Sequence, residues 1–100
     1  MNLSGHVTIV TGAGSGIGQG IALRFAEAGA SVVVADVNQK QGEQTAAACR
    51  SLGVAARFVP TDVSQAADCR RLIAAALEEF GQIDSLINNA GVNFVKPTLA

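Results

Sequence analysis

Four glycines within seven positions dominate the N-terminal part of this sequence. They lie in residues 11–18, between a short apolar run and a stretch with helical spacing. Glycine is required where the backbone turns with a positive φ, or comes so close to another group that a Cβ would collide with it. We expect Gly12 to make the turn after a first strand, Gly16 to let the backbone approach a bound group, and Gly18 to let the next helix pack against that strand.

The start of the helix that follows these glycines predicts what kind of group is bound. Its first N–H groups have no partner inside the helix and lie at the positive end of the helix dipole, which favours a nearby anion by about 0.3–1 kcal/mol. Asp36 ends the next apolar run, eighteen residues after Gly18, where its carboxylate can accept hydrogen bonds from both hydroxyls of an adenosine ribose. Together these features predict a dinucleotide cradle.

Strand and helix patterns alternate along the whole sequence. Strands are predicted over Val7–Thr11, Ser31–Asp36, residues 55–60 and Ser85–Asn88. The first helix is predicted to bury one stripe, made of Ile17, Ile21, Phe25 and Ala28, and to end at Gly29. The second helix is expected over residues 39–52 and is ended by Gly53. The third helix is expected to be capped by Ser64, to run to about Phe80 and to be ended by Gly81. Its apolar stripe is made of Leu72, Ala76 and Phe80.

This alternation predicts the fold. Right-handed crossovers give a Rossmann-type, doubly wound α/β fold whose parallel sheet has the strand order 3-2-1-4 and helices on both faces. Pro60 cannot donate to a strand ladder, which suits the end of an edge strand. A chain of one hundred residues is long enough for one domain.

Composition excludes several classes of protein. Apolar residues make up 49% of the chain and the net charge is −1, with scattered basic residues, so no nucleic-acid partner is expected. The longest apolar run, residues 72–77, is too short to span a membrane, and no signal peptide is recognised, so we expect a cytoplasmic protein. Cys49 and Cys69 lack the spacing of a metal site and are expected to be reduced and buried. The single histidine, His6, is expected to be solvated or at a strand edge.

Three motifs follow predicted strand ends in a characteristic order. They are the segment Thr11-Gly12-x-x-x-Gly16-x-Gly18, the pair Asp62-Val63, and the turn Asn88-Asn89-Ala90-Gly91. With these motifs in place, nearly the whole chain resembles the N-terminal part of the short-chain dehydrogenase/reductase family. The resemblance implies that residues 1–100 form the N-terminal portion of an NAD(P)-binding Rossmann domain, truncated after the fourth strand. Because the family pairs a fifth strand with the fourth, Leu86 and Ile87 would then lack cover. The resemblance implies that the cofactor contacts come from Gly12, Ser15, Gly16, Ile17, Gly18, Asp36, Val37, Asp62, Val63, Asn89, Ala90 and Gly91.

The resemblance also implies roles for the later motifs. Residues that match Asp62 and Val63 hold the adenine in that family, and those that match Asn89 and Ala90 line the adenosine ribose while their turn stabilises the sheet. Other interpretations stay open on the residues alone. Asp62 is also suited to capping the third helix, and the asparagine turn to satisfying its own backbone.

The preferred cofactor is predicted to be NAD rather than NADP. Family members that prefer NADP usually carry a basic residue at the position of Ser15 or just after the second strand, where this chain has Val37. Because neither residue is basic, a 2′-phosphate would meet the Asp36 carboxylate with no cation to offset the repulsion.

The chemistry that the resemblance implies is hydride transfer between a nicotinamide cofactor and an alcohol or ketone. It depends on a serine and a Tyr-x-x-x-Lys pair that lie well beyond the asparagine turn in the family. This chain contains no tyrosine, so we expect it to hold no catalytic residue, to be inactive alone, and to be a fragment of a longer enzyme. The complete enzyme is expected to take a small-molecule substrate and to form a homo-oligomer.

Two other functions fit part of the pattern. An S-adenosylmethionine-dependent methyltransferase would use the glycines and an acidic end of the second strand, but it gives the asparagine turn no role. A non-catalytic nucleotide-binding module would end at Ala100 without the catalytic groups. Competition between ligands separates the first alternative from a dehydrogenase, and the association state of the chain bears on the second.

Overall fold

The protein is a four-stranded parallel sheet covered by helices on both faces, in a computed structural model that describes residues 2–89. The sheet has the order β3-β2-β1-β4, as predicted. Its strands are β1 (Val7–Thr11), β2 (Ser31–Asp36), β3 (Ala56–Pro60) and β4 (Ser85–Asn88). The β2 strand pairs with a strand on each side and is buried on both faces, which agrees with its run of three consecutive valines.

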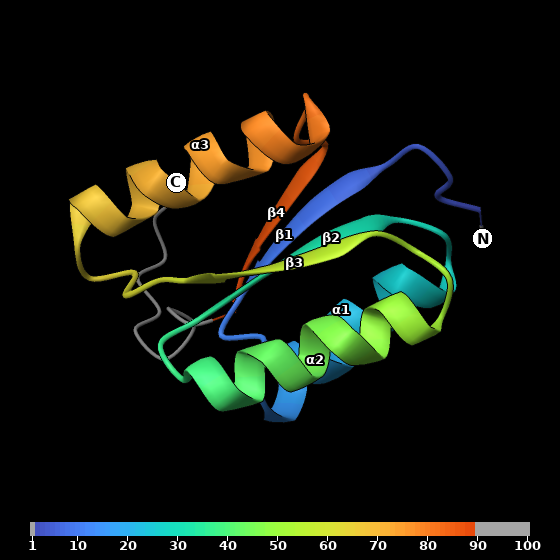
Figure 1. Cartoon of the computed structure of the whole chain (residues 1–100), viewed down its shortest axis with the longest axis horizontal. Helices are drawn as coiled ribbons and strands as arrows, with labels where there is room; N and C mark the ends of the chain where they lie inside the picture. Colours follow the sequence, from blue (N-terminus) through green and yellow to red (C-terminus); the bar gives the residue numbers. More distant parts are fainter. Residues whose placement is uncertain (1, 90–100) are drawn as a thin grey trace.

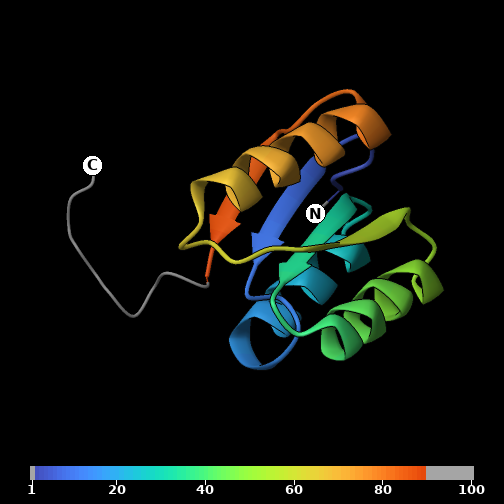
Figure 2. The ribbon, with the colours of Figure 1, turned by 60° about the vertical axis from the view of Figure 1, so that its left-hand side comes forward.

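Each crossover between neighbouring strands contains one helix. The helices are α1 (Gly16–Glu27), α2 (Gln39–Ser51) and α3 (Ala66–Phe80). Figures 1 and 2 show that α1 and α2 lie on one face of the sheet and α3 on the other, which is the doubly wound arrangement predicted from the sequence. Gly29, Gly53 and Gly81 follow the three helices with positive φ values of 102°, 98° and 77°, as the helix-ending role predicts.

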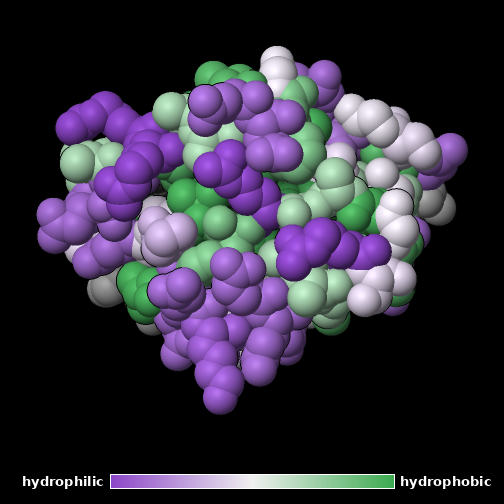
Figure 3. All heavy atoms as spheres, in the orientation of Figure 1, coloured by the Kyte–Doolittle hydropathy of each residue, from purple (hydrophilic) through white to green (hydrophobic). Residues whose placement is uncertain are grey.

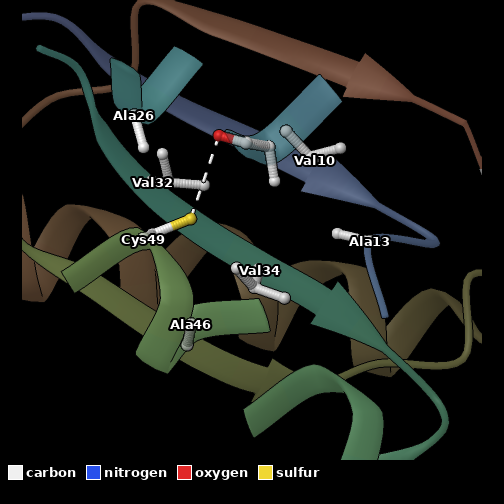
Figure 4. Packing of buried hydrophobic residues seen from close by; sticks show 8 residues of the cluster. Val10, Ala13, Ala26, Val32, Val34, Ala46 and Cys49 are labelled. Atoms are coloured by element: carbon white, nitrogen blue, oxygen red, sulfur yellow. Dashed lines mark hydrogen bonds between the residues drawn. The ribbon is translucent and has the colours of Figure 1, made fainter. Parts of the chain in front are cut away.

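The larger core cluster lies between the sheet and the α1/α2 layer. Val10, Val32 and Val34 point from β1 and β2 toward small residues of the two helices (Figure 4). Cys49 of α2 is fully buried there, and its thiol lies 3.8 Å from the carbonyl oxygen of Ala22 in α1, the contact drawn as a dashed line. Burial raises the pKa of this thiol above its ordinary value, against a weaker opposing effect of the Arg50 charge.

The opposite face of the sheet is covered by α3. Leu72 and Ala76 are buried against Ile9, Val33 and other residues of that face, and Phe80 packs beside them, so the predicted stripe of α3 is confirmed.

The predicted stripe of α1 is wrong at its first position. Ile17 has 77% of its surface exposed, and the buried residues of α1 are Gly18, Ala22 and Ala26. These small residues, four positions apart, let the helix lie close to the sheet, whereas Ile21 and Phe25 pack at its margin. The large apolar side chains of α1 therefore predict the wrong face, because the helix contacts the sheet through small residues that allow a close approach.

Polar and apolar surfaces are unevenly distributed. Hydrophilic side chains gather over the lower part of Figure 3, the region of α2 in Figure 1, whose outward residues are mostly exposed. On β4, Leu86 is 51% exposed, as expected for a strand with one neighbour among the described residues, but Ile87 packs against the larger core cluster. Cys69 is only half-buried, which corrects the expectation that both thiols are buried.

Candidate functional site

The strand ends that the sequence assigns to the site meet at one edge of the sheet. In Figure 1 all four strands run toward the left of the view, and the loops that follow β1, β2 and β3 gather there. The register places Thr11 beside both Ala35 and Asn88, and Asp36 beside Pro60. Residues from positions 12, 36, 62 and 89 therefore lie on neighbouring loops, as the order 3-2-1-4 requires.

The glycine segment has the predicted geometry. Gly12 and Gly16 have φ values of 65° and 59°, in the left-handed region that favours glycine. A Cβ on Gly18 would lie 2.0 Å from the carbonyl oxygen of Gly12, so the contact between α1 and the end of β1 leaves no space for a side chain. Around Gly16 a Cβ would meet nothing within 4 Å, which leaves its surroundings open for a ligand.

Asn89 joins the end of β4 to the glycine turn. Its side-chain amide donates a hydrogen bond of 3.2 Å to the carbonyl oxygen of Gly12, and the hydroxyl of Thr11 donates one of 3.0 Å to the side chain of Asn88. Asn89 thus contacts the backbone of the glycine turn, and Asn88 contacts a side chain of β1. Ala90 and Gly91, the other two members of the predicted turn, lie outside the described residues.

The N-terminus of α1 is open to an anion. Ser15 is the N-cap in an extended conformation and its side chain makes no capping hydrogen bond, while the first turn of α1 carries no acidic residue. The first N–H groups of the helix therefore remain available to an external acceptor. Exposed apolar side chains stand beside this edge, since Ile17 and Val37 are 77% and 71% exposed.

Asp36 places a carboxylate at this edge, and this carboxylate is already hydrogen-bonded. Its Oδ2 accepts from the backbone N–H of Gly14 and its Oδ1 from that of Asn38, both at 2.8 Å. None of the ion pairs among residues 2–89 involves Asp36, so its charge has no cationic partner in this part of the chain. The carboxylate is half-buried at the point where the sequence predicts a ribose.

The Asp62 loop differs from the predicted capping. The N-cap of α3 is Gln65, with no side-chain cap, whereas Ser64 donates from both its N–H (3.0 Å) and its hydroxyl (2.6 Å) to Oδ1 of Asp62. Ser64 is therefore not the cap, because it lies one residue before the N-cap and its hydroxyl binds the Asp62 carboxylate rather than an N–H group of the helix. The Val63 carbonyl accepts from the thiol of Cys69 at 3.5 Å, which ties the loop to α3.

Asp68, in the first turn of α3, completes this loop. Its Oδ2 accepts a 2.8 Å hydrogen bond from the backbone N–H of Asp62. That bond, with the hydrogen bond and charge of Arg71, holds the pKa of the Asp68 carboxyl below its ordinary value despite partial desolvation. The negative charge also suits the positive end of the α3 dipole.

Sequence reasoning missed three residues of this edge. The motifs predict no role for Gly14 among the four glycines, and none for Asn38 or Asp68. A signal was present for Asn38, because asparagine directly before a helical run is a common N-cap, and its side chain does accept from the N–H of Gln41 at 2.9 Å. No local pattern reveals the contact of Asp68 with Asp62.

A second polar cluster lies at the opposite edge of the sheet. Nε2 of His6 lies 3.0 Å from the hydroxyl of Ser85, which donates to the hydroxyl of Thr8 at 2.8 Å. Asp84 accepts the N–H of Val7, and this bond, with Gln82 and the nearby His6, lowers the pKa of its carboxyl. His6 thus has the strand-edge position that was expected and lies far from the candidate cradle.

Within residues 2–89, no group of three or more histidine, cysteine, aspartate or glutamate side chains is arranged to hold a metal ion. In the same part of the chain, no helix has the length and apolar character needed to cross a membrane.

Comparison with known proteins gives one family. The model of the short-chain dehydrogenase family matches residues 6–100. An uncharacterized oxidoreductase of Thermotoga maritima is 42% identical over 92% of this chain and 36% of its own length, and a 2,5-dichloro-2,5-cyclohexadiene-1,4-diol dehydrogenase of Sphingobium indicum is 43% identical over 90% and 36%. The crystal structure of a hydroxysteroid dehydrogenase from Escherichia coli matches with a TM-score of 0.84 and 38% identity over 87% of this chain and 37% of that one.

The chain spans little more than a third of the length of these relatives. The matched part contains the sheet, the three helices and the glycine turn described above. With the family model covering nearly every residue, the chain belongs to the short-chain dehydrogenase family.

Proposed function

We propose that this chain binds NAD across the carboxyl edge of the sheet, as the cofactor-binding part of a dehydrogenase. The observation that carries the proposal is the contact between Asp36 and Gly14. It brings a carboxylate that has no ion-pair partner among residues 2–89 against the loop that leads, two residues later, into α1, and two residues span at most about 7 Å. Acceptors for a ribose and donors for a diphosphate therefore lie within the reach of one dinucleotide.

The described residues fit this cofactor. Gly12, Gly16 and Gly18 provide a backbone turn without side chains at the mouth of α1. A carboxylate has about four acceptor positions, and Asp36 uses two for backbone N–H groups, which leaves capacity for ribose hydroxyls. The exposed apolar surface of Ile17 and Val37 suits contact with planar rings.

A preference for NAD over NADP follows from charge. A 2′-phosphate near Asp36 would face a carboxylate that has no ion-pair partner within residues 2–89. Two like charges about 4 Å apart repel by on the order of 1–4 kcal/mol, depending on how well water screens them. Neither Ser15 nor Val37 offers a cation to offset this cost.

The reaction of the complete protein is proposed from the family. The nicotinamide ring, when bound, accepts or donates a hydride, and the named activities of two relatives concern a diol and a hydroxysteroid. We infer an alcohol or ketone of small size as the substrate class of the whole enzyme, which we also expect to be a homo-oligomer. Within the chain, the residues named above bind and orient the cofactor, and we assign no proton-transferring residue.

Calorimetric titration of the chain with NAD and NADP tests the proposal. NAD should bind more tightly than NADP, and Asp36→Ala should weaken NAD by about 1.5–3 kcal/mol, the usual value of a hydrogen bond to a charged group. Asp36→Arg should shift the preference toward NADP. Glu43→Ala, which removes an exposed carboxylate from α2, is the matched control and should change neither affinity. A folded chain that binds neither dinucleotide contradicts the proposal.

The two alternatives have separate tests. Family membership removes the main support for a methyltransferase, and S-adenosylmethionine should fail to compete with NAD in a thermal-shift assay. A non-catalytic module remains consistent with NAD binding, and a monomeric, cooperatively melting chain would favour it. Activity that appears only in a longer product of the same reading frame would favour the dehydrogenase.

A further inference from the structure

The Asp36 carboxylate connects two loops that the sequence separates. Oδ2 accepts from Gly14 in the glycine segment, and Oδ1 accepts from Asn38 just before α2, each at 2.8 Å. Asn38 in turn caps α2 through the N–H of Gln41 at 2.9 Å. One side chain thus joins the loop after β1 to the start of the helix after β2.

Gly14 is packed tightly against this connection. It is buried, and an added Cβ would lie 2.9 Å from Oδ2 of Asp36 and 3.1 Å from Cβ of Gln41. The backbone N–H of Gly14 is directed to the carboxylate, so it is not available to a ligand. The loop is therefore held at Gly14, one residue before the N-cap Ser15 and two before α1 begins.

From these contacts we propose that Asp36 is a positioning residue for the diphosphate-binding segment, in addition to any contact with a ribose. This inference rests on the function proposed above. Two charge-assisted hydrogen bonds hold Gly14 and Asn38 in place, and the N–H groups that open α1 follow directly from Gly14. Without the carboxylate, the glycine segment has to be ordered by the ligand, and this cost appears as weaker binding.

A carboxylate that only accepts ribose hydroxyls behaves differently in one measurable respect. Toward a ligand without those hydroxyls it is merely a negative charge near a diphosphate. Its removal then leaves the affinity unchanged or raises it, because repulsion between like charges disappears. A positioning carboxylate predicts the opposite sign, because its removal loosens the segment that holds the diphosphate.

The test compares ADP with 2′,3′-dideoxy-ADP, which keeps the adenine and diphosphate but lacks both ribose hydroxyls. Affinities are measured by NMR titration of the full chain for wild type, Asp36→Ala and the control Glu43→Ala. For Asp36→Ala we expect dideoxy-ADP to bind about tenfold more weakly than to wild type, a loss of about 1.4 kcal/mol. ADP should lose more than that, since the direct contacts are also removed, and the control should lose neither.

Equal or tighter binding of dideoxy-ADP to Asp36→Ala overturns the inference. The loss has to occur in a folded variant, so circular dichroism and the urea midpoint are measured in parallel. If Asp36→Ala does not fold, Asp36→Asn carries the same comparison, because it keeps one acceptor oxygen and the size of the side chain while removing the charge. It should bind dideoxy-ADP more weakly than wild type, and equal or tighter binding again counts against positioning.

Failure of the proposed function looks different. If wild type binds neither NAD nor ADP, the cradle itself is refuted and the positioning role falls with it. If wild type binds both, but Asp36→Ala does not weaken the affinity for dideoxy-ADP, the cradle stands and only the positioning role is refuted. Faster amide hydrogen exchange at Gly14 and Asn38 in ligand-free Asp36→Ala is a further expected result, and unchanged exchange contradicts the inference.

Discussion

Replacing Gly18 by alanine tests whether α1 must lie as close to β1 as the structure has it. The added Cβ would be 2.0 Å from the carbonyl oxygen of Gly12 and 2.7 Å from the side-chain nitrogen of Asn89. Real Cβ atoms essentially never approach another heavy atom within 3.0 Å, so the helix and the turn must separate by at least about 1 Å. Both neighbours belong to the candidate cradle.

The magnitude follows from two opposing effects. Alanine favours a helix over glycine by about 1 kcal/mol, because less backbone entropy is lost on folding. Overpacking a tight contact costs about 1–3 kcal/mol, and here the obstacle is a backbone carbonyl that cannot rotate away. We therefore expect Gly18→Ala to lower the free energy of unfolding by up to about 2 kcal/mol, and to weaken NAD binding further because the Gly12 turn is displaced.

Gly20→Ala is the matched control. Gly20 lies in the same helix, is exposed, and has nothing within 4 Å of an added Cβ. This variant gains the helix propensity without the collision and should be more stable than wild type by about 0.5–1 kcal/mol. Urea unfolding of both variants and calorimetry with NAD provide the measurements. A Gly18→Ala chain as stable as Gly20→Ala would refute the close packing on which the cradle depends.

Three further predictions concern stability and reactivity. The pKa of Asp84 is lowered mainly by the N–H of Val7, so the ionised carboxylate stabilises the folded state. This contribution to the free energy of unfolding is complete above the ordinary aspartate pKa of about 3.9 and is lost as the pH falls through the lower pKa of the folded state. Asp84→Asn should therefore lose less stability toward urea between about pH 6 and about pH 3 than wild type does. Iodoacetamide should alkylate the native chain at half-buried Cys69 but not at Cys49, whose thiol is buried and has a raised pKa. Cys49 should react only after urea unfolds the chain. Equal labelling rates of the two cysteines by mass spectrometry would contradict the packing of α1 on α2. Leu72→Ala should lower the free energy of unfolding by about 2–5 kcal/mol in the same urea assay, because Leu72 is 3% exposed and packs between α3 and the sheet. A loss below about 1 kcal/mol would mean that α3 does not cover the sheet as described.

Much of the fold could be predicted because the local signals agree with the tertiary contacts. The β-branched run of β2 is buried on both faces, and Gly29 and Gly81 end helices with the positive φ that only glycine adopts easily. The signals failed where small residues matter more than large ones. Periodicity placed Ile17 in the core, although the surface of α1 that meets the sheet is centred on Ala22 and lacks bulky side chains.

The candidate site could be predicted in position but only partly in its contacts. Sequence motifs identify the strand ends, and the sheet order brings them together, so Asp36 and Asn89 lie where the motifs imply. Hydrogen bonds between residues far apart in sequence leave no local pattern. The contact of Asp36 with Gly14, 22 residues earlier in the chain, is therefore visible only in the structure.

The contacts at this edge share a common form that bears on binding. In each case a polar side chain from one strand end or helix start holds the backbone of a loop: Asp36 holds Gly14, and Asn89 holds Gly12. Both of these loop residues precede the first N–H groups of α1. A turn fixed from two sides loses little further freedom when a ligand arrives, so more of the interaction with a diphosphate contributes to affinity. Because Asp36 ends β2 and Asn89 follows β4, on either side of β1, the strand order itself places them to act on the same turn.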